Sequence, residues 1–428
     1  MSDEFIKVDQ DTLGEQAYRL ISELYPICRS ITGNGVRETL RVLTKRLPLD
    51  IHEVPTGTQV FDWTVPREWN IRDAYLLDPL GRKIIDFKKS NLHIVSYSVP
   101  VNRKMSLDEL QPHLHTLPDR PDWIPYKTSY YKESWGFCLS HNQWQQLSEG
   151  TYEVFIDSEL TDGSLTYGEL VLPGELSEEV LISTHICHPS MCNDNLSGIA
   201  IAVLLAEKLQ QMSHRYTYRF LFIPGTIGAI TWLAHHQESV KCIEHGLVLT
   251  GLGDCGNVTY KKSRRGNAMI DRIVDYVLRH CGSDFNRVDF SPYGYDERQY
   301  CSPGFNLPVG RLSRTPYGEY PQYHTSADNL AFVKPHALGG SVSVLFNIIN
   351  VLEMNTKFVN QNPFCEPQLG KRGLYDNIEF DQLAMLWVLN LSDGHHSLLD
   401  VAELSGIDFN VIEQAAKVLS DNMLLKVV

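Results

Sequence analysis

Apolar residues in the first fifty positions recur at the three- and four-residue intervals of amphipathic helices. The pattern predicts one helix over residues 12–29, with Asp11 as its N-cap, and a second helix over residues 36–47, which Pro48 ends. The run TGNG at residues 32–35, between the two helices, is a turn signal. We therefore expect the chain to open with two helices.

The pattern changes at residue 51. Up to about residue 160 the chain is rich in aromatic and β-branched residues, in short runs such as 61–66 and 92–97, separated by Pro, Asp and Asn turns. These runs predict a mostly β domain at residues 51–160. Because helices precede this segment and an α/β pattern follows it, we interpret it as an insertion into a larger domain.

From residue 169 apolar runs of strand length alternate with helical patterns. The predicted strands lie at 179–184, 218–223 and 247–252, and the predicted helices at 196–209, 226–235, 269–281 and 341–354. Such alternation predicts an α/β domain with a mixed, mainly parallel sheet, whose ligands bind at the carboxyl ends of the strands. The domain is discontinuous, with residues 1–50 and 161–360 on either side of the β-rich insert.

The last part of the chain, residues 374–428, forms a separate short module. Its pattern predicts a helix at 398–405, a helix at 408–420 and a strand at 423–428, an order that resembles a winged helix-turn-helix. Four Lys and Arg residues stand against nine Asp and Glu residues between positions 371 and 428. That charge has the wrong sign for DNA, so we expect a role in packing or protein contact.

Composition narrows the class of protein. The net charge of −14 argues against a nucleic-acid partner. We expect no membrane partner, since we find no apolar run near the roughly 20 residues that cross a bilayer. The polar N-terminus resembles neither a secretory signal nor a transit peptide. Nine scattered cysteines are typical of reduced thiols in a cytoplasmic protein. The composition does not decide whether the protein is a monomer or a homo-oligomer.

Two residues near the first predicted strand of this domain have the side chains of a metal site. His185 follows the apolar run 179–184, at the carboxyl end of the strand, and Asp194 stands just before the helix at 196–209. Imidazole and carboxylate on adjoining loops are typical zinc ligands. The alternative is that the two side chains only hydrogen-bond each other or cap the helix.

A second polar constellation lies late in the chain. The run YHTSADNL at residues 323–330 contains His324, follows a loop rich in Gly, Pro and Tyr, and precedes the last large predicted helix. The alternative for this run is a polar loop in which Asp328 caps a helix. A third candidate, Asp254, follows the predicted strand at 247–252.

The order of these residues resembles that of the zinc-dependent aminopeptidases and the related glutamate carboxypeptidases. Those enzymes have a strand that ends in His, then Asp-Asn or Asp-Asp before Ser-Gly and a helix, Glu-Glu after the next strand, a later Asp and a late Tyr-His-Thr. The resemblance covers roughly residues 10–50 and 165–355. It implies that the metal ligands are His185, Asp194, Asp254 and His324. The whole chain resembles an uncharacterised bacterial subfamily with an inserted β domain and a winged-helix tail.

The chain departs from the family pattern at two places. Where the family has an Asp that orients the first imidazole, this sequence has Cys187, and the adjacent His188 is an alternative ligand or a substitute for that Asp. Where the family has Glu-Glu, as general base and ligand of a second metal, this sequence has Gly225 and Thr226. Neither residue can take a proton from water or balance the charge of a second Zn²⁺.

Another carboxylate could replace the lost base. Asp296 and Glu297 precede Arg298 in an acidic run, and Glu319 is a further candidate. Of these, Glu297 is the residue we assign as the catalytic candidate. The alternative is that the charges at 296–298 are solvated and paired with one another.

Two arginines flank the approach to His324 along the chain. Arg314, and also Arg311, could hold a substrate carboxylate through two parallel hydrogen bonds. We assign substrate binding to Arg314. The alternative for both side chains is a structural ion pair.

The resemblance implies a zinc-dependent hydrolase that acts on an amide or peptide bond of a small substrate. The loss of the Glu-Glu pair at Gly225 and Thr226 favours one zinc ion per chain, and two ions stay open as the alternative. A second hypothesis is a catalytically impaired zinc-binding protein of peptidase descent that acts as a binding or scaffold module. A third, a DNA-binding regulator, is disfavoured by the acidic C-terminal module.

Overall fold

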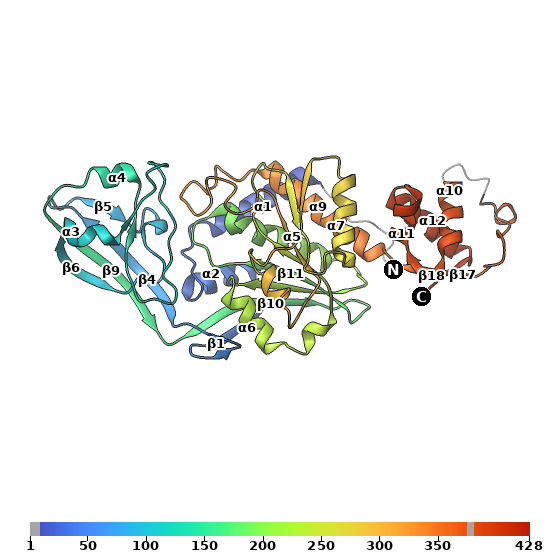
Figure 1. Ribbon diagram of the computed structural model, residues 1–428, viewed down its shortest axis with the longest axis horizontal. Coiled ribbons are helices and arrows are strands. Elements are labelled where there is room, and N and C mark those ends of the chain that lie inside the picture. The colour runs from blue at the N-terminus through green and yellow to red at the C-terminus, as the bar shows by residue number, and fades with distance from the viewer. Residues whose placement is uncertain (1–8, 375–380) are drawn as a thin grey trace. The chain divides into compact units, whose positions relative to one another are not determined.

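The computed structural model describes residues 9–374 and 381–428. Its largest element is an eight-stranded mixed sheet (Figure 1). In spatial order the strands are β1 (Asp50–Pro55), β10 (Ser164–Leu172), β12 (Thr217–Ile223), β11 (Glu179–His185), β13 (Ile243–Leu249), β16 (Val309–Ser313), β14 (Val258–Lys261) and β15 (Phe285–Val288). The predicted α/β fold class is thereby confirmed.

The four central strands, β12, β11, β13 and β16, run parallel to one another. Ile182 of β11 pairs with Phe220 of β12 on one side and with Leu247 of β13 on the other. Every residue of β11 is buried, as predicted for this strand and as expected of a central strand covered on both faces. Because parallel strands end at the same edge, the loops that follow β11, β12 and β13 meet there.

Antiparallel strands complete the sheet on both sides. β10 is antiparallel to both β1 and β12, and β14 is antiparallel to β16. The sequence pattern did not indicate these outer strands, because their apolar residues are separated by polar residues or glycine, as in the run SLTYGELVL of β10. β1 lies at the start of the segment predicted to form the insert, and it pairs with the main sheet instead.

The predicted helices are present, with ends that differ by a few residues. They are α1 (Gln10–Leu24), α2 (Asn34–Leu43), α5 (Ser197–Leu209), α6 (Ile227–His235), α7 (Met269–His280) and α9 (Pro335–Met354). The N-cap of α1 is Asp9, whose carboxylate accepts from the backbone N–H of Thr12 at 3.3 Å, whereas the predicted cap Asp11 lies in the first turn. Helix α5 follows β11 and is buried along nearly its whole length.

Helix α9 changes one expectation from the sequence. Among the described helices it is the one long and apolar enough to cross a bilayer by length and composition, so the expectation of no such apolar run is wrong. However, 72% of its apolar window is buried inside the protein. That burial is typical of a core helix.

A second sheet lies within the chain between β1 and β10. It contains β5 (Lys83–Asp86), β4 (Glu68–Leu77), β9 (Thr151–Thr161) and β6 (Val101–Ser106), all antiparallel. Between β6 and β9 the chain forms α3 (Leu107–Leu110), α4 (His141–Gln145) and the short paired strands β7 (Leu114–His115) and β8 (Phe137–Cys138). We call residues 56–163 the β insert. The long loop between β7 and β8 becomes important for the site.

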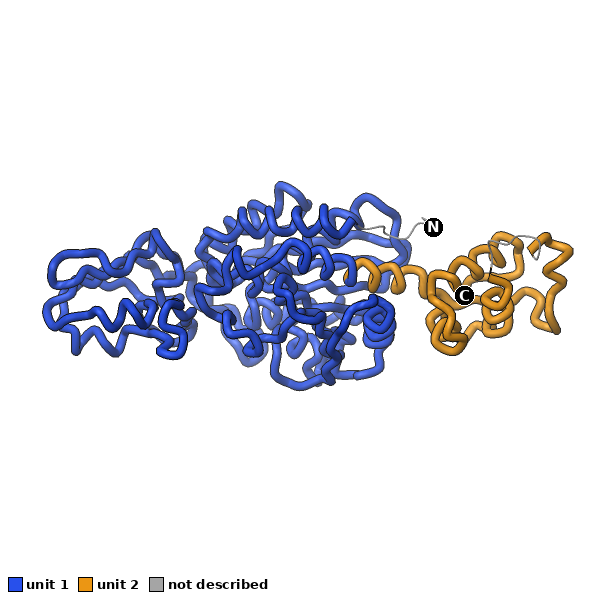
Figure 2. Tube along the Cα trace, turned by 90° about the horizontal axis from the view of Figure 1, so that it is seen from above, with its two compact units in different colours: residues 1–3, 7–344 blue, residues 4–6, 345–428 orange. Residues whose placement is uncertain are grey.

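Residues from 345 onward belong to a second compact unit (Figure 2). Its sheet has the order β18 (Asp393–Ser397), β17 (Lys357–Asn360) and β19 (Leu425–Val427), and its helices are α10 (Gln382–Leu391), α11 (Leu398–Ser405) and α12 (Phe409–Asp421). The order α11, turn, α12 and strand agrees with the sequence pattern. Helix α10 and the strands β17 and β18 went unpredicted.

An ion-pair network ties three strands of the main sheet together. Arg219 of β12 donates from Nε and Nη2 to both oxygens of Glu179 on β11, each at 2.6 Å, and from Nη1 to Glu169 on β10 at 2.6 Å. Trp232 of α6 also donates to Glu169 at 3.0 Å. The three charged side chains are only 7–12% exposed. The carboxylates therefore depend on Arg219 for charge compensation.

We expect Arg219→Met to lower the free energy of unfolding by about 3–5 kcal/mol, because it leaves two nearly buried carboxylates without their cation. Chemical denaturation of the full chain measures this change. Arg72→Met is the matched control, since Arg72 also contacts two carboxylates but is 55% exposed. Its effect should be much smaller. Equal losses in the two variants would contradict the assigned role of Arg219.

Candidate metal centre and adjoining cavity

The carboxylate of Asp194 lies among three imidazoles. His185 Nε2 is 2.8 Å from Oδ1, while His324 Nε2 and His188 Nε2 are 3.0 and 3.8 Å from Oδ2. Ligand atoms of His185, His188 and Asp194 all lie within 4.8 Å of one another. Nitrogen and carboxylate donors that converge in this way suit a zinc ion. The structure thus brings three of the predicted ligands together, and adds His188, the predicted alternative.

The sheet and two loops hold these side chains in place. His185 is the last residue of β11, and Asp194 lies in the irregular segment Cys192–Leu196 before α5. The carboxylate of Asp328 accepts from the backbone N–H of Asn193 at 2.6 Å and of Asp194 at 2.9 Å. Asp328 therefore fixes the loop that presents Asp194, a role beyond that of a helix cap.

Burial and the neighbouring charges set the protonation of this cluster. Burial opposes the ionisation of Asp194, but His188, His185 and His324 outweigh it and hold the pKa of Asp194 well below its usual range. Burial lowers the pKa of His188 to about 3, against the attraction of Asp194. At neutral pH the cluster therefore offers a carboxylate and a neutral His188 imidazole, the forms that bind metal.

The β insert supplies part of the site. The backbone N–H of Tyr126 donates to His324 O at 2.8 Å, and its ring centroid lies 5.1 Å from that of His324 and 5.5 Å from that of His188. On the other side, Tyr323 stacks on His324 at 3.9 Å, and Tyr295 stacks on His185 at 5.0 Å. Sequence reasoning missed Tyr126, because nothing in its local pattern indicates contact with a loop 198 positions later.

A cavity of about 190 Å³ adjoins the histidines. We call it the first cavity. It is lined by Ile31, Tyr130, His185, Cys187, His188, Gly225, Thr226, Tyr293, Gly294, Tyr295, Asp296, Tyr317 and Tyr323. Aromatic rings thus form much of its wall, beside the polar cluster.

Asp296 occupies the place where the sequence lacks a carboxylate. Its Oδ1 accepts from the backbone N–H of Thr226 at 2.7 Å, and both residues line the first cavity together with Gly225. Burial raises the pKa of Asp296 to about 6, although His185 and the Thr226 amide favour ionisation. Asp296 precedes the short helix α8 (Glu297–Tyr300). It was one of the alternatives from the sequence, but not the residue assigned.

Two residues at the site have backbones in the left-handed region. The φ angle is 62° at Thr226 and 54° at His324. Such conformations cost side chains about 1–3 kcal/mol each and persist where surrounding contacts enforce them. Here the amide of Thr226 is bound by Asp296, and the carbonyl of His324 by Tyr126. Strain of this kind is common in functional sites.

The structure places Asp254 away from the three imidazoles. Its Oδ1 accepts from the hydroxyl of Thr315 at 2.6 Å and the amide of Gly256 at 2.7 Å, and its Oδ2 accepts from Asn193 Nδ2 at 3.0 Å. Among the described residues the metal-capable group contains His185, His188 and Asp194. The geometry therefore favours a positioning role for Asp254, through Asn193, over the predicted ligand role.

Glu297 and Arg314 also lie elsewhere than predicted. Glu297 is fully buried and pairs with Lys261 Nζ at 2.9 Å, outside the lining of the first cavity. Arg314 donates to Gly256 O, Ala337 O and Ser341 Oγ at 2.6–2.9 Å. Both arrangements are structural, because the charged groups are used within the protein. The chain's direction at 296–297 turns Asp296 toward the cavity and Glu297 away from it.

The remaining candidates take different positions. Arg311 is buried, and its guanidinium carbon lies 5.9 and 5.4 Å from the ring centroids of Tyr295 and Tyr317, behind the aromatic wall of the first cavity. Glu319 is exposed. Cys187 takes the place of the family's orienting Asp, and its Sγ accepts from the Gly225 amide at 3.3 Å. Burial raises the pKa of Cys187 to about 12, so the group is a neutral thiol.

Solved structures with the same fold define the class of protein. A zinc aminopeptidase from Bacillus subtilis aligns with a TM-score of 0.58 over 78% of this chain and 94% of its own, at 13% identity. A peptidase M28 precursor from Shewanella amazonensis aligns with a TM-score of 0.55 over 80% and 96%, at 14% identity. These likenesses show the fold, which is that of the zinc aminopeptidases.

The family follows from the sequence profiles. This chain belongs to the family described as a domain of unknown function (DUF4910), which matches residues 18–355, and a winged helix-turn-helix profile matches residues 356–427. A Clostridium acetobutylicum protein named "Putative polysaccharide biosynthesis protein with aminopeptidase-like domain" is 54% identical over 430 residues, 99% of each chain. The crystal structure of a peptidase-like protein from the same organism aligns with a TM-score of 0.95 over 98% of both chains, at 54% identity. The predicted resemblance and the winged-helix tail are confirmed.

Proposed function

We propose that this chain is a zinc-dependent hydrolase that cleaves an amide or peptide bond of a small substrate. The observation that carries the proposal is the convergence of His185, His188 and His324 on Asp194, beside a cavity with a second carboxylate, Asp296. The aminopeptidase-like fold supports the same class of reaction. The small volume of the first cavity, about 190 Å³, favours a small substrate.

The side chains present fit a zinc ion. The imidazole of His185 lies beside one oxygen of Asp194, and those of His324 and His188 lie beside the other. We infer one ion per chain rather than two. A second ion would need a carboxylate besides Asp296, which we assign as the base, but Asp254 accepts three hydrogen bonds elsewhere and Gly225 and Thr226 offer none.

Zinc, when bound, supplies a Lewis acid that polarises the scissile carbonyl and makes water more acidic. Asp296 can accept the proton of the attacking water and return it to the leaving nitrogen, because its carboxylate lines the cavity that receives the amide. With a pKa of about 6, Asp296 is mostly ionised at neutral pH and can accept a proton. The same pKa is close enough to neutral pH for the protonated carboxyl to donate that proton afterwards. The thiol of Cys187 and the tyrosine rings limit the access of bulk water to this proton transfer.

A second candidate function is a zinc-binding protein without turnover. The observation that favours it is the absence of a carboxylate at 225 and 226, where the aminopeptidase pattern has its base. The two proposals differ in the role of Asp296, which acts as the general base in the hydrolase and has no catalytic role in the binding protein. Further expectations from the sequence, namely a cytoplasmic location and no nucleic-acid or membrane partner, stay predictions.

Asp194→Ala and His324→Ala should each reduce bound zinc by more than about tenfold, because each removes a ligand from the cluster. Metal analysis after dialysis of the purified variants against buffered zinc measures the loss. Asp271→Asn is the matched control, since it changes a buried carboxylate whose hydrogen-bond partners, Tyr260 and Ser263, lie outside the cluster. Full zinc occupancy in both ligand variants would overturn the metal assignment.

Asp296→Asn should lower kcat for amide hydrolysis by about 10²–10⁴-fold while zinc content is unchanged, because the amide cannot accept the proton of water. The measurement is a screen of aminoacyl and N-acyl amides, followed by steady-state kinetics on any that react. Glu319→Gln, at an exposed carboxylate, is the control and should leave kcat as it is. Equal activity in wild type and Asp296→Asn would assign the base to another group.

A carboxylate introduced at position 225 tests whether the activity lost in the Asp296→Asn variant can be restored. A Cβ at Gly225 would lie 3.5 Å from Cys187 Sγ and 3.6 Å from His185 Cβ, which are ordinary contacts. Gly225→Glu in the Asp296→Asn background should therefore restore part of the lost kcat, whereas Gly225→Glu alone should not raise it. If native protein loaded with zinc hydrolyses no amide in the screen, and Gly225→Glu alone creates activity, the second candidate function is correct.

A further inference from the structure

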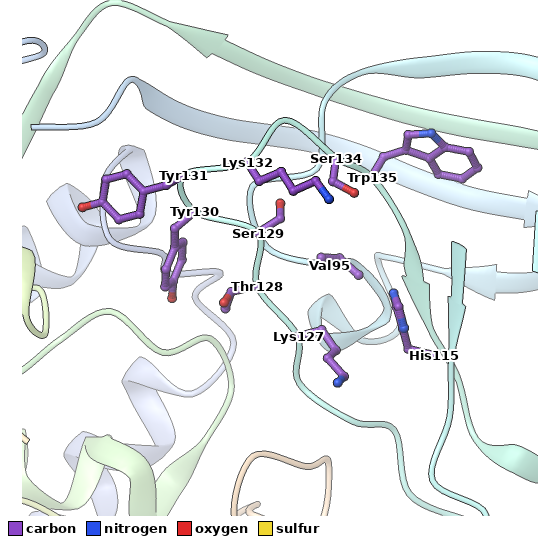
Figure 3. Close-up of a pocket in the computed structure, with 10 residues that line it drawn as sticks. All are labelled: Val95, His115, Lys127, Thr128, Ser129, Tyr130, Tyr131, Lys132, Ser134 and Trp135. Carbon is purple, nitrogen blue, oxygen red and sulfur yellow. The ribbon is translucent and has the colours of Figure 1, made fainter. Parts of the chain in front are cut away.

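A larger cavity lies in the β insert (Figure 3). We call it the second cavity. Its volume is about 530 Å³, and it is formed mostly by the loop between β7 and β8. Its lining residues are Val95, His115, Lys127, Thr128, Ser129, Tyr130, Tyr131, Lys132, Ser134 and Trp135. No part of the proposed reaction uses this space.

The lining of the second cavity is cationic and hydroxylic. Lys127 and Lys132 are exposed, and His115 is half-buried beside them. None of the ten described lining residues is acidic. Glu133, which the loop carries between them, instead pairs with Arg67. Ammonium groups and hydroxyls without a carboxylate among them favour an anionic ligand.

The two cavities share a wall. Tyr130 lines both of them, and its hydroxyl lies 2.9 Å from that of Tyr126, whose ring contacts His188 and His324. The loop is held there by its backbone, because Ser96 N donates to Lys127 O at 2.9 Å and Ser129 N donates to Ser96 O at 3.0 Å. Tyr130 therefore forms part of the wall between the second cavity and the cavity that adjoins the candidate metal centre.

Aromatic surfaces complete the second cavity. In the view of Figure 3, Tyr130 and Tyr131 lie on one side of the hollow, and Trp135 and His115 on the other. The Trp135 ring is fixed by stacking on His113, at a centroid distance of 3.6 Å. Fixed rings of this kind can pack against the body of a ligand while the lysines bind its charge.

We propose that the second cavity is a substrate subsite that binds a carboxylate or phosphate group of the molecule whose amide bond enters the first cavity. The inference rests on the proposed hydrolase function and adds a substrate class to it. The preferred substrate is an amide with an anionic group on one side of the bond. Lys127 and Lys132 bind that group, and Tyr130 lies between it and the scissile bond.

The first arm of the test measures binding and needs no turnover. Inorganic phosphate and succinate are titrated into the full chain by calorimetry, with Lys127→Gln/Lys132→Gln as the variant. Both exposed charges of the subsite are then lost, so binding should weaken roughly tenfold or more. Lys88→Gln/Lys104→Gln is the matched control, since it removes two exposed lysines of the β insert outside the cavity. The affinity of this control variant for phosphate and succinate should equal that of wild type.

The second arm compares two amides of nearly equal shape, the leucyl-aspartic acid α-amide, whose side-chain carboxylate is free, and leucyl-asparagine amide, which differ in one negative charge. Wild type should have a KM several-fold lower for the anionic amide, and Lys127→Gln/Lys132→Gln should abolish this difference between the two KM values. Anion binding that depends on the lysines, without hydrolysis of either amide, would support the subsite but contradict the hydrolase. Equal anion affinity in the cavity variant and the control would overturn the subsite. Binding of only one probe would assign carboxylate or phosphate as the group.

Discussion

The negative charge of a fully buried carboxylate needs hydrogen-bond donors or positive charge beside it. Asp194 is such a carboxylate, and the residues around it meet this need. Its two oxygens face three imidazoles, two at the end of β11 and one from a loop late in the chain, and its own backbone is held by Asp328. Each of these contacts depends on the parallel sheet, because β11 ends at His185 and α5 begins directly after the Asp194 segment. The cluster is therefore a property of the fold and not of one motif.

The same requirement explains why the site is built from two layers of polar groups. The histidines touch Asp194, while Asp328 and Asn193 fix the loop that carries it, and Asp254 in turn accepts from Asn193. A residue in the outer layer can thus be essential to geometry without touching a ligand. In a family of related sequences, such positioning residues follow the same order along the chain as true ligands do.

Much of the core could be predicted from the sequence. The strands at 179–184 and 218–223 contain the apolar runs 180–182 and 220–223, and the late YHTSADNL run stands before a large helix. Such runs indicate central strands that are buried on both faces, whereas the apolar residues of β10 and β14 are separated by polar ones. The resemblance to the zinc aminopeptidases indicated His185, Asp194 and His324, and their places after a strand or before a helix agreed with it.

The parts that could not be predicted depend on side-chain direction and on contacts between distant segments. Asp296 and Glu297 are neighbours in sequence, yet one lines the first cavity and the other pairs with Lys261. No pattern along the chain distinguishes them, because the turn into α8 decides which carboxylate faces inward. The structural role of Arg314 could not be predicted either, because the backbone carbonyls to which it donates come near it only in the folded structure.

The short pairing between residues 124–126 and 324–326 has a consequence for how the protein unfolds. Ile124 and Ser326 bond each other in both directions, and Tyr126 bonds the carbonyl of His324, whose φ of 54° needs such support. Local openings of a protein involve units that are stabilised together. The β insert and the loop of His324 are therefore tied by their backbones, and we expect an opening that detaches the insert to loosen the His324 imidazole as well. The candidate metal centre thus depends on a domain that lies far from His324 in sequence.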